Sequence, residues 1–282
     1  MRDQFDYIVL NIGLLPTLTH FFPRMMANAE NFPGVGNPLS PESQTSVAES
    51  ASAPAHSAWR HLPRRDSTNP TRQELAVQFI AVCLSLIALH EFAHLVLGHL
   101  DPAIQATINA DPLAAQALEL AADAHAAIWG RILNQAKRAA LNQKLPNPIP
   151  EGMRAFHRTP EQSIENYLLA VFLVFRIMDE TKWSDETLAS RPHPPAPFRF
   201  QVVCLHLANR LNEAGDSDGA NRLRSVATET WERGEAIFAR ALGRNPDRKV
   251  MSDTMSDECE RHYERVSERA RTLPEHLFNS TR

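Results

Sequence analysis

The chain has 282 residues, of which 43% are hydrophobic, and carries a formal net charge of −4 at neutral pH. A chain of this length and composition can bury a substantial core as one domain or two. The balance of charge gives no global basic surface, so nucleic-acid binding is not expected.

The first seventy residues divide into two segments. Residues 1–30 form an N-terminal segment with one predicted strand at 7–12, and residues 1–6 lack the basic and then apolar order of a secretory signal peptide. Residues 31–70 are rich in Pro, Ser, Ala and Asn and poor in large apolar residues. They predict a linker or disordered loop, with a lid over a cleft as the alternative.

A long helix is predicted over residues 72–100. Between Leu75 and Leu100 the only residue of the types Asp, Glu, Lys and Arg is Glu91. A surface helix would show polar residues every third or fourth position, so this helix is expected to lie buried in the core. Its most apolar run is short for a membrane span of about 20 residues, and no membrane association is expected.

Within that helix, His90, Glu91 and His94 form an HExxH signature. Histidines four residues apart share a helix face and can bind one zinc ion, while Glu91 is placed to activate a zinc-bound water. A metal ion would also offset the cost of burying a carboxylate beside two imidazoles. Because Leu97 and Leu100 stand where metzincins need glycine and histidine, that class is excluded. The alternative is an ordinary helix with two partly buried histidines.

The next predicted helix, over residues 111–141, carries the main candidate for the third ligand. Glu119 and Asp123 are four residues apart and share one face. We expect Glu119 to bind the metal and Asp123 to accept a hydrogen bond from the far nitrogen of a ligating histidine. A solvated acidic face is the alternative. His125 and His99 are weaker candidates for the third ligand.

A third helix is predicted to begin at Thr159, with a capping box and a proline at its first position, and to have residues 168–177 as its middle. Its middle is almost wholly apolar, so it should pack behind the two helices that carry the metal ligands. Arg176, near its end, should pair with Asp179 or with an acid across the core.

His193 lies between two prolines, on what should be a stiff extended loop. A histidine held in this way can donate a hydrogen bond to the oxyanion that forms at a scissile carbonyl. The alternative is a rigid surface turn.

The pattern of residues 201–282 predicts amphipathic helices, with turns at 215–219 and 243–246. Residues 258–271 are densely charged with both signs, which predicts a solvated helix face with pairs four residues apart. A helix that docks a protein partner is the alternative.

The motifs resemble those of gluzincin metallopeptidases, in which HExxH is followed by ExxAD on a later helix, here beginning at Glu119. The segment from His193 to Arg199 is similar to the HPPxxxR segment of the HtpX heat-shock proteases and the CAAX prenyl endopeptidases. This resemblance implies that His193 and Arg199 take part in binding the substrate and the transition state.

The spacing departs from those membrane proteases, which have clear transmembrane helices and a longer gap before the glutamate. Here 24 residues separate His94 from Glu119. That gap, with Gly98 and His99 after the motif, resembles the ImmA/IrrE-type regulatory peptidases and the Lit-type phage-exclusion peptidases. The likeness covers about residues 85–200 and implies zinc peptidase chemistry rather than a particular substrate.

We therefore expect a mainly α fold, with α+β as the alternative. A zincin-like helical core would occupy 71–200, between the N-terminal strand or small sheet and a C-terminal helical region at 201–282.

We expect the protein to be a zinc-dependent endopeptidase with Zn²⁺ as its cofactor. Its substrate would be an intracellular protein or peptide, cleaved in a regulatory or phage-defence role. The three cysteines show no CxxC pairing, which favours a reducing cytoplasm. Two alternatives stay open, a non-catalytic zinc-stabilised scaffold or partner-binding protein, and a metal-free helical protein with a chance HExxH.

Overall fold

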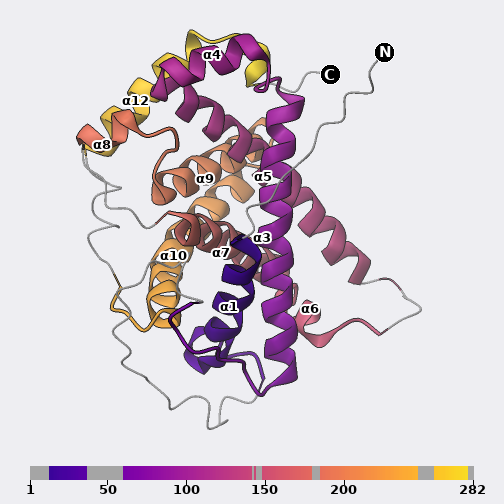
Figure 1. The fold of residues 1–282 in the computed structure, drawn as a ribbon. Coiled ribbons are helices and arrows are strands. Elements are labelled where there is room, and N and C mark those ends of the chain that lie inside the picture. Colours follow the sequence, from indigo (N-terminus) through magenta and orange to yellow (C-terminus); the bar gives the residue numbers. More distant parts are fainter. Residues whose placement is uncertain are drawn as a thin grey trace, which may run out of the picture.

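The computed structural model describes residues 13–36, 60–141, 143, 148–179, 185–246 and 257–278. Within these residues every regular element is a helix (Figure 1), which confirms the mainly α fold. The predicted strand at 7–12 and most of the predicted linker, residues 37–59, lie outside the described residues.

Two long helices organise the molecule. The first, α3 (Pro70–Val96), spans most of the height of the molecule in Figure 1, and α5 (Pro112–Leu141) packs against it. The start of α5 is the one that the Asp-Pro pair at 111–112 predicts, whereas α3 begins at Pro70, two residues before the predicted start at 72. The Asp111 carboxylate caps α5 by accepting hydrogen bonds from the backbone N–H groups of Leu113 and Ala114.

The expectation that α3 would be buried all round and extend to residue 100 is wrong on both counts. One face is buried, but Val77, Phe92 and Val96 are exposed on the remainder. The helix ends at Val96 because Gly98 has a left-handed backbone, with φ of +75°, which side-chain-bearing residues rarely adopt.

Shorter helices surround this pair. Figure 1 places α1 and α6 near one end of α3, and α4 and α12 near the other. Their bounds are α1 (Leu14–Ala27), α4 (Pro102–Ala110), α6 (Glu151–Phe156), α7 (Pro160–Met178), α8 (Asp185–Ser190), α9 (Ala196–Glu213), α10 (Ser217–Ala241) and α12 (Asp257–Arg271).

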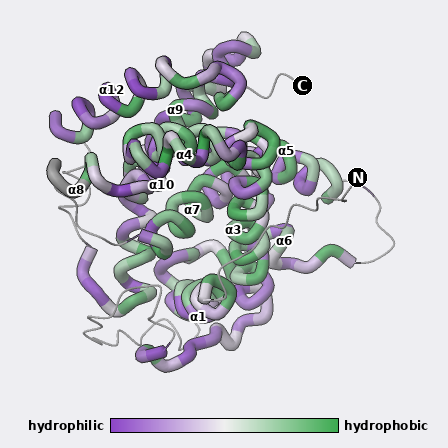
Figure 2. Tube along the Cα trace, turned by 45° about the horizontal axis from the view of Figure 1, so that its top comes forward, coloured by the Kyte–Doolittle hydropathy of each residue, from purple (hydrophilic) through white to green (hydrophobic). Residues whose placement is uncertain are grey.

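The helix expected to begin at Thr159 is α7, and its central position is confirmed. Figure 2 shows it in the middle of the molecule, while the largely hydrophilic α12 lies at the edge. The Thr159 side chain caps α7 by accepting from the backbone N–H of Gln162 at 3.1 Å. Arg176 reaches an acid across the core, donating two hydrogen bonds to the Glu235 carboxylate of α10 at 2.9 and 3.2 Å.

Four of the described helices were not expected from the sequence, α1, α4, α6 and α8. In α1, Leu18, Phe22 and Met25 are fully buried at helical spacing, and the Phe22 ring stacks on Phe79 of α3 with centroids 5.6 Å apart. The pattern was obscured by two prolines in this stretch. The predicted boundary between residues 200 and 201 falls inside α9.

Among the described residues, α3 alone is long and apolar enough to cross a membrane, by length and composition. A core helix of a soluble protein passes the same test. Because α3 packs against α1, α5, α6 and α7, the structure is compatible with a soluble protein.

The side chain of Arg72, in the first turn of α3, is 2% exposed and ties the chain after α1 to the core. Its guanidinium donates five hydrogen bonds to backbone carbonyls of Val35 (2.9 Å), Met26 (3.0 Å), Asn28 (3.3 Å), Ala29 (3.3 Å) and Phe32 (2.8 Å). A planar group with donors in a fixed fork suits this set of convergent acceptors.

Replacing Arg72 by Leu should lower the free energy of unfolding by about 3 kcal/mol or more, since several buried carbonyls would lose their donor. Urea unfolding of the variant and of the exposed control Arg64→Leu measures the difference. Equal losses in the two variants would contradict the structural role of Arg72.

Candidate metal centre

The side of α3 that faces α5 carries both histidines of the HExxH motif. Their Nε2 atoms are 3.1 Å apart. Glu119 projects from α5 between them, with Oε2 at 3.4 Å from Nε2 of His90 and Oε1 at 3.4 Å from Nε2 of His94. The three side chains therefore bring two nitrogens and a carboxylate together, and this group can hold a metal ion.

The distances fit a single small ion. Ligand atoms at about 2.0–2.1 Å from a tetrahedral zinc ion stand about 3.3 Å from one another. In the structure the two Nε2 atoms are 3.1 Å apart, and each lies 3.4 Å from a different oxygen of the Glu119 carboxylate, which is close to that edge length. Three protein ligands would leave a fourth position for water or substrate, as catalytic zinc sites do.

Asp123 fixes the orientation of the His90 ring. Nδ1 of His90 lies 2.8 Å from Oδ1 of Asp123. The lone pair of Nε2 then faces Glu119 when Nδ1 donates to this carboxylate.

Arg199 of α9 holds Asp123 from the other side. Its Nε and one terminal nitrogen each donate to the Asp123 carboxylate at 2.7 Å, and its guanidinium lies over the Phe175 ring, 4.5 Å from the centroid. Both charged side chains are almost completely buried. Burial alone would raise the pKa of Asp123, but Arg199 and His90 outweigh it and hold the pKa below its ordinary value.

The site attracts positive charge. Burial would raise the pKa of Glu119, yet its hydrogen bonds to His193, His90 and His94 keep it well below the ordinary value, so the group stays ionised. Burial would lower the pKa of His90, but Asp123 and Glu119 outweigh burial and raise it to about 9. Two carboxylates beside two imidazoles suit a cation.

A cavity of about 460 Å³ opens onto these residues, and Glu91 is part of its lining. His193 is also in the lining and is 59% exposed, with Nδ1 at 3.1 Å from Oε2 of Glu119. The structure therefore brings together all seven residues singled out from the sequence in one cavity. These are His90, Glu91, His94, Glu119, Asp123, His193 and Arg199.

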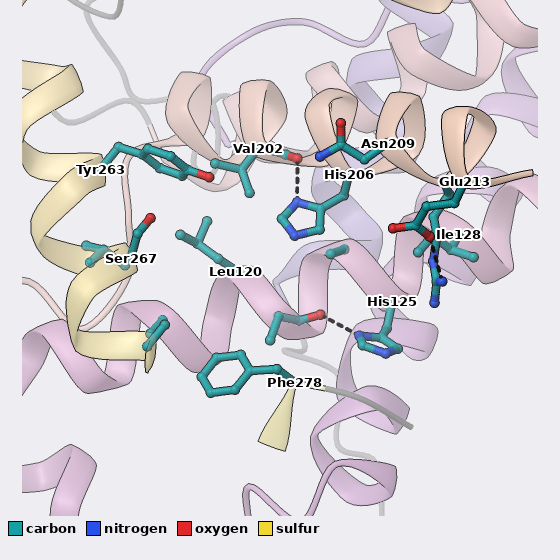
Figure 3. A pocket seen from close by; sticks show the side chains of 16 residues that line it. Leu120, His125, Ile128, Val202, His206, Asn209, Glu213, Tyr263, Ser267 and Phe278 are labelled. Atoms are coloured by element: carbon teal, nitrogen blue, oxygen red, sulfur yellow. Dashed lines mark hydrogen bonds and ion pairs between the residues drawn. The ribbon is translucent and has the colours of Figure 1, made fainter. Parts of the chain in front are cut away.

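The two weaker candidates for the third ligand lie elsewhere. Nδ1 of His99 is 2.8 Å from Nδ1 of His94, on the opposite edge of that ring from Nε2. His125 belongs to a second cavity of about 420 Å³ between α5, α9 and α12. Figure 3 shows His125 and His206 at this second cavity, each with Nδ1 bonded to a backbone carbonyl of its own helix.

Two features of the site were missed at the level of sequence. The pairing of Arg199 with Asp123 joins residues 76 positions apart, and no local spacing signals it. The contact between His94 and His99 could have been predicted from the glycine at position 98, because this glycine turns the chain back after the helix.

Replacing Arg199 by Met should lower the free energy of unfolding by about 3–5 kcal/mol, because the Asp123 carboxylate would stay buried without its cation. The matched control is Arg210→Met on the same helix, whose pair with Glu213 is exposed and should be worth less than about 1 kcal/mol. Denaturant unfolding compares the two, and losses of equal size would contradict the assignment.

A family model described as Peptidase U49 matches residues 42–215, more than half of the chain. The matched span includes all seven residues of the candidate site and stops before α12. No curated protein and no solved structure matches the chain at a significant level.

Proposed function

The chain belongs to the peptidase U49 family, and we propose that it is a zinc-dependent endopeptidase. The observation that carries the proposal is the convergence of the His90, His94 and Glu119 ligand atoms at separations of 3.1–3.4 Å. Two imidazole nitrogens and one carboxylate are a ligand set that zinc commonly takes in hydrolytic sites.

Zinc, when bound, supplies a Lewis acid that polarises a peptide carbonyl and lowers the pKa of a coordinated water to about 7. The chain contributes the proton transfers. Glu91 lines the same cavity as the three ligands, and we assign to it the role of accepting a proton from the attacking water. It then passes that proton to the nitrogen of the departing amine, acting first as base and then as acid.

Two residues are candidates for binding the oxyanion, and their surroundings differ. Arg199 is buried and its guanidinium already bonds to Asp123, so we assign it a positioning role. His193 is exposed beside Glu119, on the stiff segment between two prolines. We therefore assign the hydrogen bond to the developing oxyanion to His193.

The proposed substrate is a protein or peptide inside the cell, cut in a regulatory or phage-defence role. Cys83, Cys204 and Cys259 are all buried free thiols, which suits a reducing compartment such as the cytoplasm. The cavity has an apolar wall that includes Ile87 and Phe175, beside the polar metal centre. Such a wall can hold an apolar side chain of an extended peptide next to the scissile bond.

Replacing Glu91 by Gln should leave zinc content unchanged and abolish peptide hydrolysis, because the amide cannot take the proton. Zinc per chain is measured by elemental analysis. Hydrolysis is measured by incubating a peptide library from a cell proteome with each protein and identifying new termini by mass spectrometry.

Glu119→Gln is the companion variant and should lose zinc, since its amide is a much weaker ligand than the carboxylate. Cleavages made by the wild type and equally by Glu91→Gln would refute the mechanism. Zinc retained by a wild-type chain that cleaves no peptide would favour the non-catalytic scaffold.

Replacing His193 by Ala should lower kcat/KM on any substrate so identified by about 100-fold or more, while zinc content stays near that of the wild type. His206→Ala is the matched control, because His206 lines the second cavity. If kcat/KM of His193→Ala stays at the wild-type value, His193 does not contact the oxyanion.

A further inference from the structure

We propose that His99 and the backbone carbonyl of Leu277 form a relay that sets the tautomer and orientation of the metal ligand His94. The relay rests on the proposed metal site, but it assigns a positioning role to two residues outside the HExxH, ExxAD and HPPxxxR segments. It also makes the C-terminal segment, outside the span matched by the family model, part of the centre.

The turn at the end of α3 brings His99 back against His94. Gly98 takes the left-handed conformation. The backbone N–H of His99 then donates to the His94 carbonyl at 3.0 Å, and that of Gly98 donates to the Leu95 carbonyl at 3.2 Å. This pair of bonds is a Schellman motif. It returns the His99 side chain to the turn that carries the ligand.

The protons of the relay follow from its last acceptor. Nε2 of His99 is 2.7 Å from the Leu277 carbonyl oxygen, which can only accept, so Nε2 carries the hydrogen. In the neutral ring Nδ1 then holds a lone pair. It accepts the hydrogen bond from Nδ1–H of His94 at 2.8 Å, which leaves the lone pair of His94 on Nε2, toward His90 and Glu119.

The two ligating histidines are thus held by different partners. His90 bonds to a carboxylate, Asp123, whereas His94 bonds to a neutral imidazole. A second carboxylate at the position of His99 would add another buried negative charge to a centre that already contains Glu119 and Asp123. The imidazole and carbonyl provide the same orientation without that charge.

The relay is fixed in place by packing. His99 is 1% exposed and Leu277 is fully buried. The Gln105 side chain of α4 donates to the His99 carbonyl at 2.9 Å. Phe278, next to Leu277, packs against apolar residues of α3, α5 and α12 and borders the second cavity (Figure 3).

The affinity of the full-length chain for zinc tests the relay, measured by competition with a chromophoric chelator. His99→Phe keeps a ring but removes both nitrogens, and should weaken zinc binding by about 10–100-fold. His99→Asn retains an acceptor near the position of Nδ1 and should stay within about 3-fold of wild type. Equal affinities for wild type and His99→Phe, or equal losses in both variants, would overturn the relay.

His125→Phe is the matched control, a buried histidine that bonds to a backbone carbonyl away from the metal ligands. It should bind zinc as the wild type does, and a loss equal to that of His99→Phe would overturn the relay. Failure of the wild type itself to bind zinc would instead refute the proposed function.

A second measurement needs no variant. In the ¹⁵N-labelled, zinc-loaded wild type, the ring nitrogen shifts should show N–H at Nδ1 of His94 and at Nε2 of His99. Nδ1 of His99 should show the shift of an unprotonated nitrogen. A proton on Nδ1 of His99 would reverse the direction of the bond and overturn the relay.

Discussion

Two carboxylates inside a helical core are the constraint on which this structure depends. Glu119 and Asp123 are largely removed from water, and an ionised group in that position is costly unless cations and donors surround it. Arg199 supplies one cation. The convergence of His90 and His94 on Glu119 defines the place for another, which we propose to be zinc.

The close packing of α3 and α5 allows these side chains to converge. Where α3 meets α5, the buried contact includes small side chains, namely Ala93 on α3 with Ala121 and Ala122 on α5. Small residues let two helices approach closely. Imidazole and carboxylate groups projecting from neighbouring backbones can then approach within bonding reach of one ion. The nearly all-buried α7 packs against both α3 and α5, which keeps this pair of helices in place.

The sequence predicts the parts of the site that are local in the chain. A spacing of four residues places His90 and His94 on one face, and an Asp-Pro pair marks the start of the helix that carries Glu119. The contacts that complete the site depend on tertiary structure. No periodicity indicates that Arg199 would reach Asp123. The helix α1 was missed because it too depends on tertiary structure. Two prolines obscure its apolar pattern, and the helix is stabilised by packing against α3.

Zinc-edge X-ray absorption of the purified full-length chain tests the central claim most directly, because it reports the ligand atoms around the ion itself. We predict two imidazole nitrogens, a carboxylate oxygen and a further oxygen at about 2.0–2.1 Å from the zinc ion. Three or more imidazoles, or sulfur in the first shell, would contradict the assignment of Glu119 as the third ligand. A chain that binds no zinc would contradict the metal centre itself.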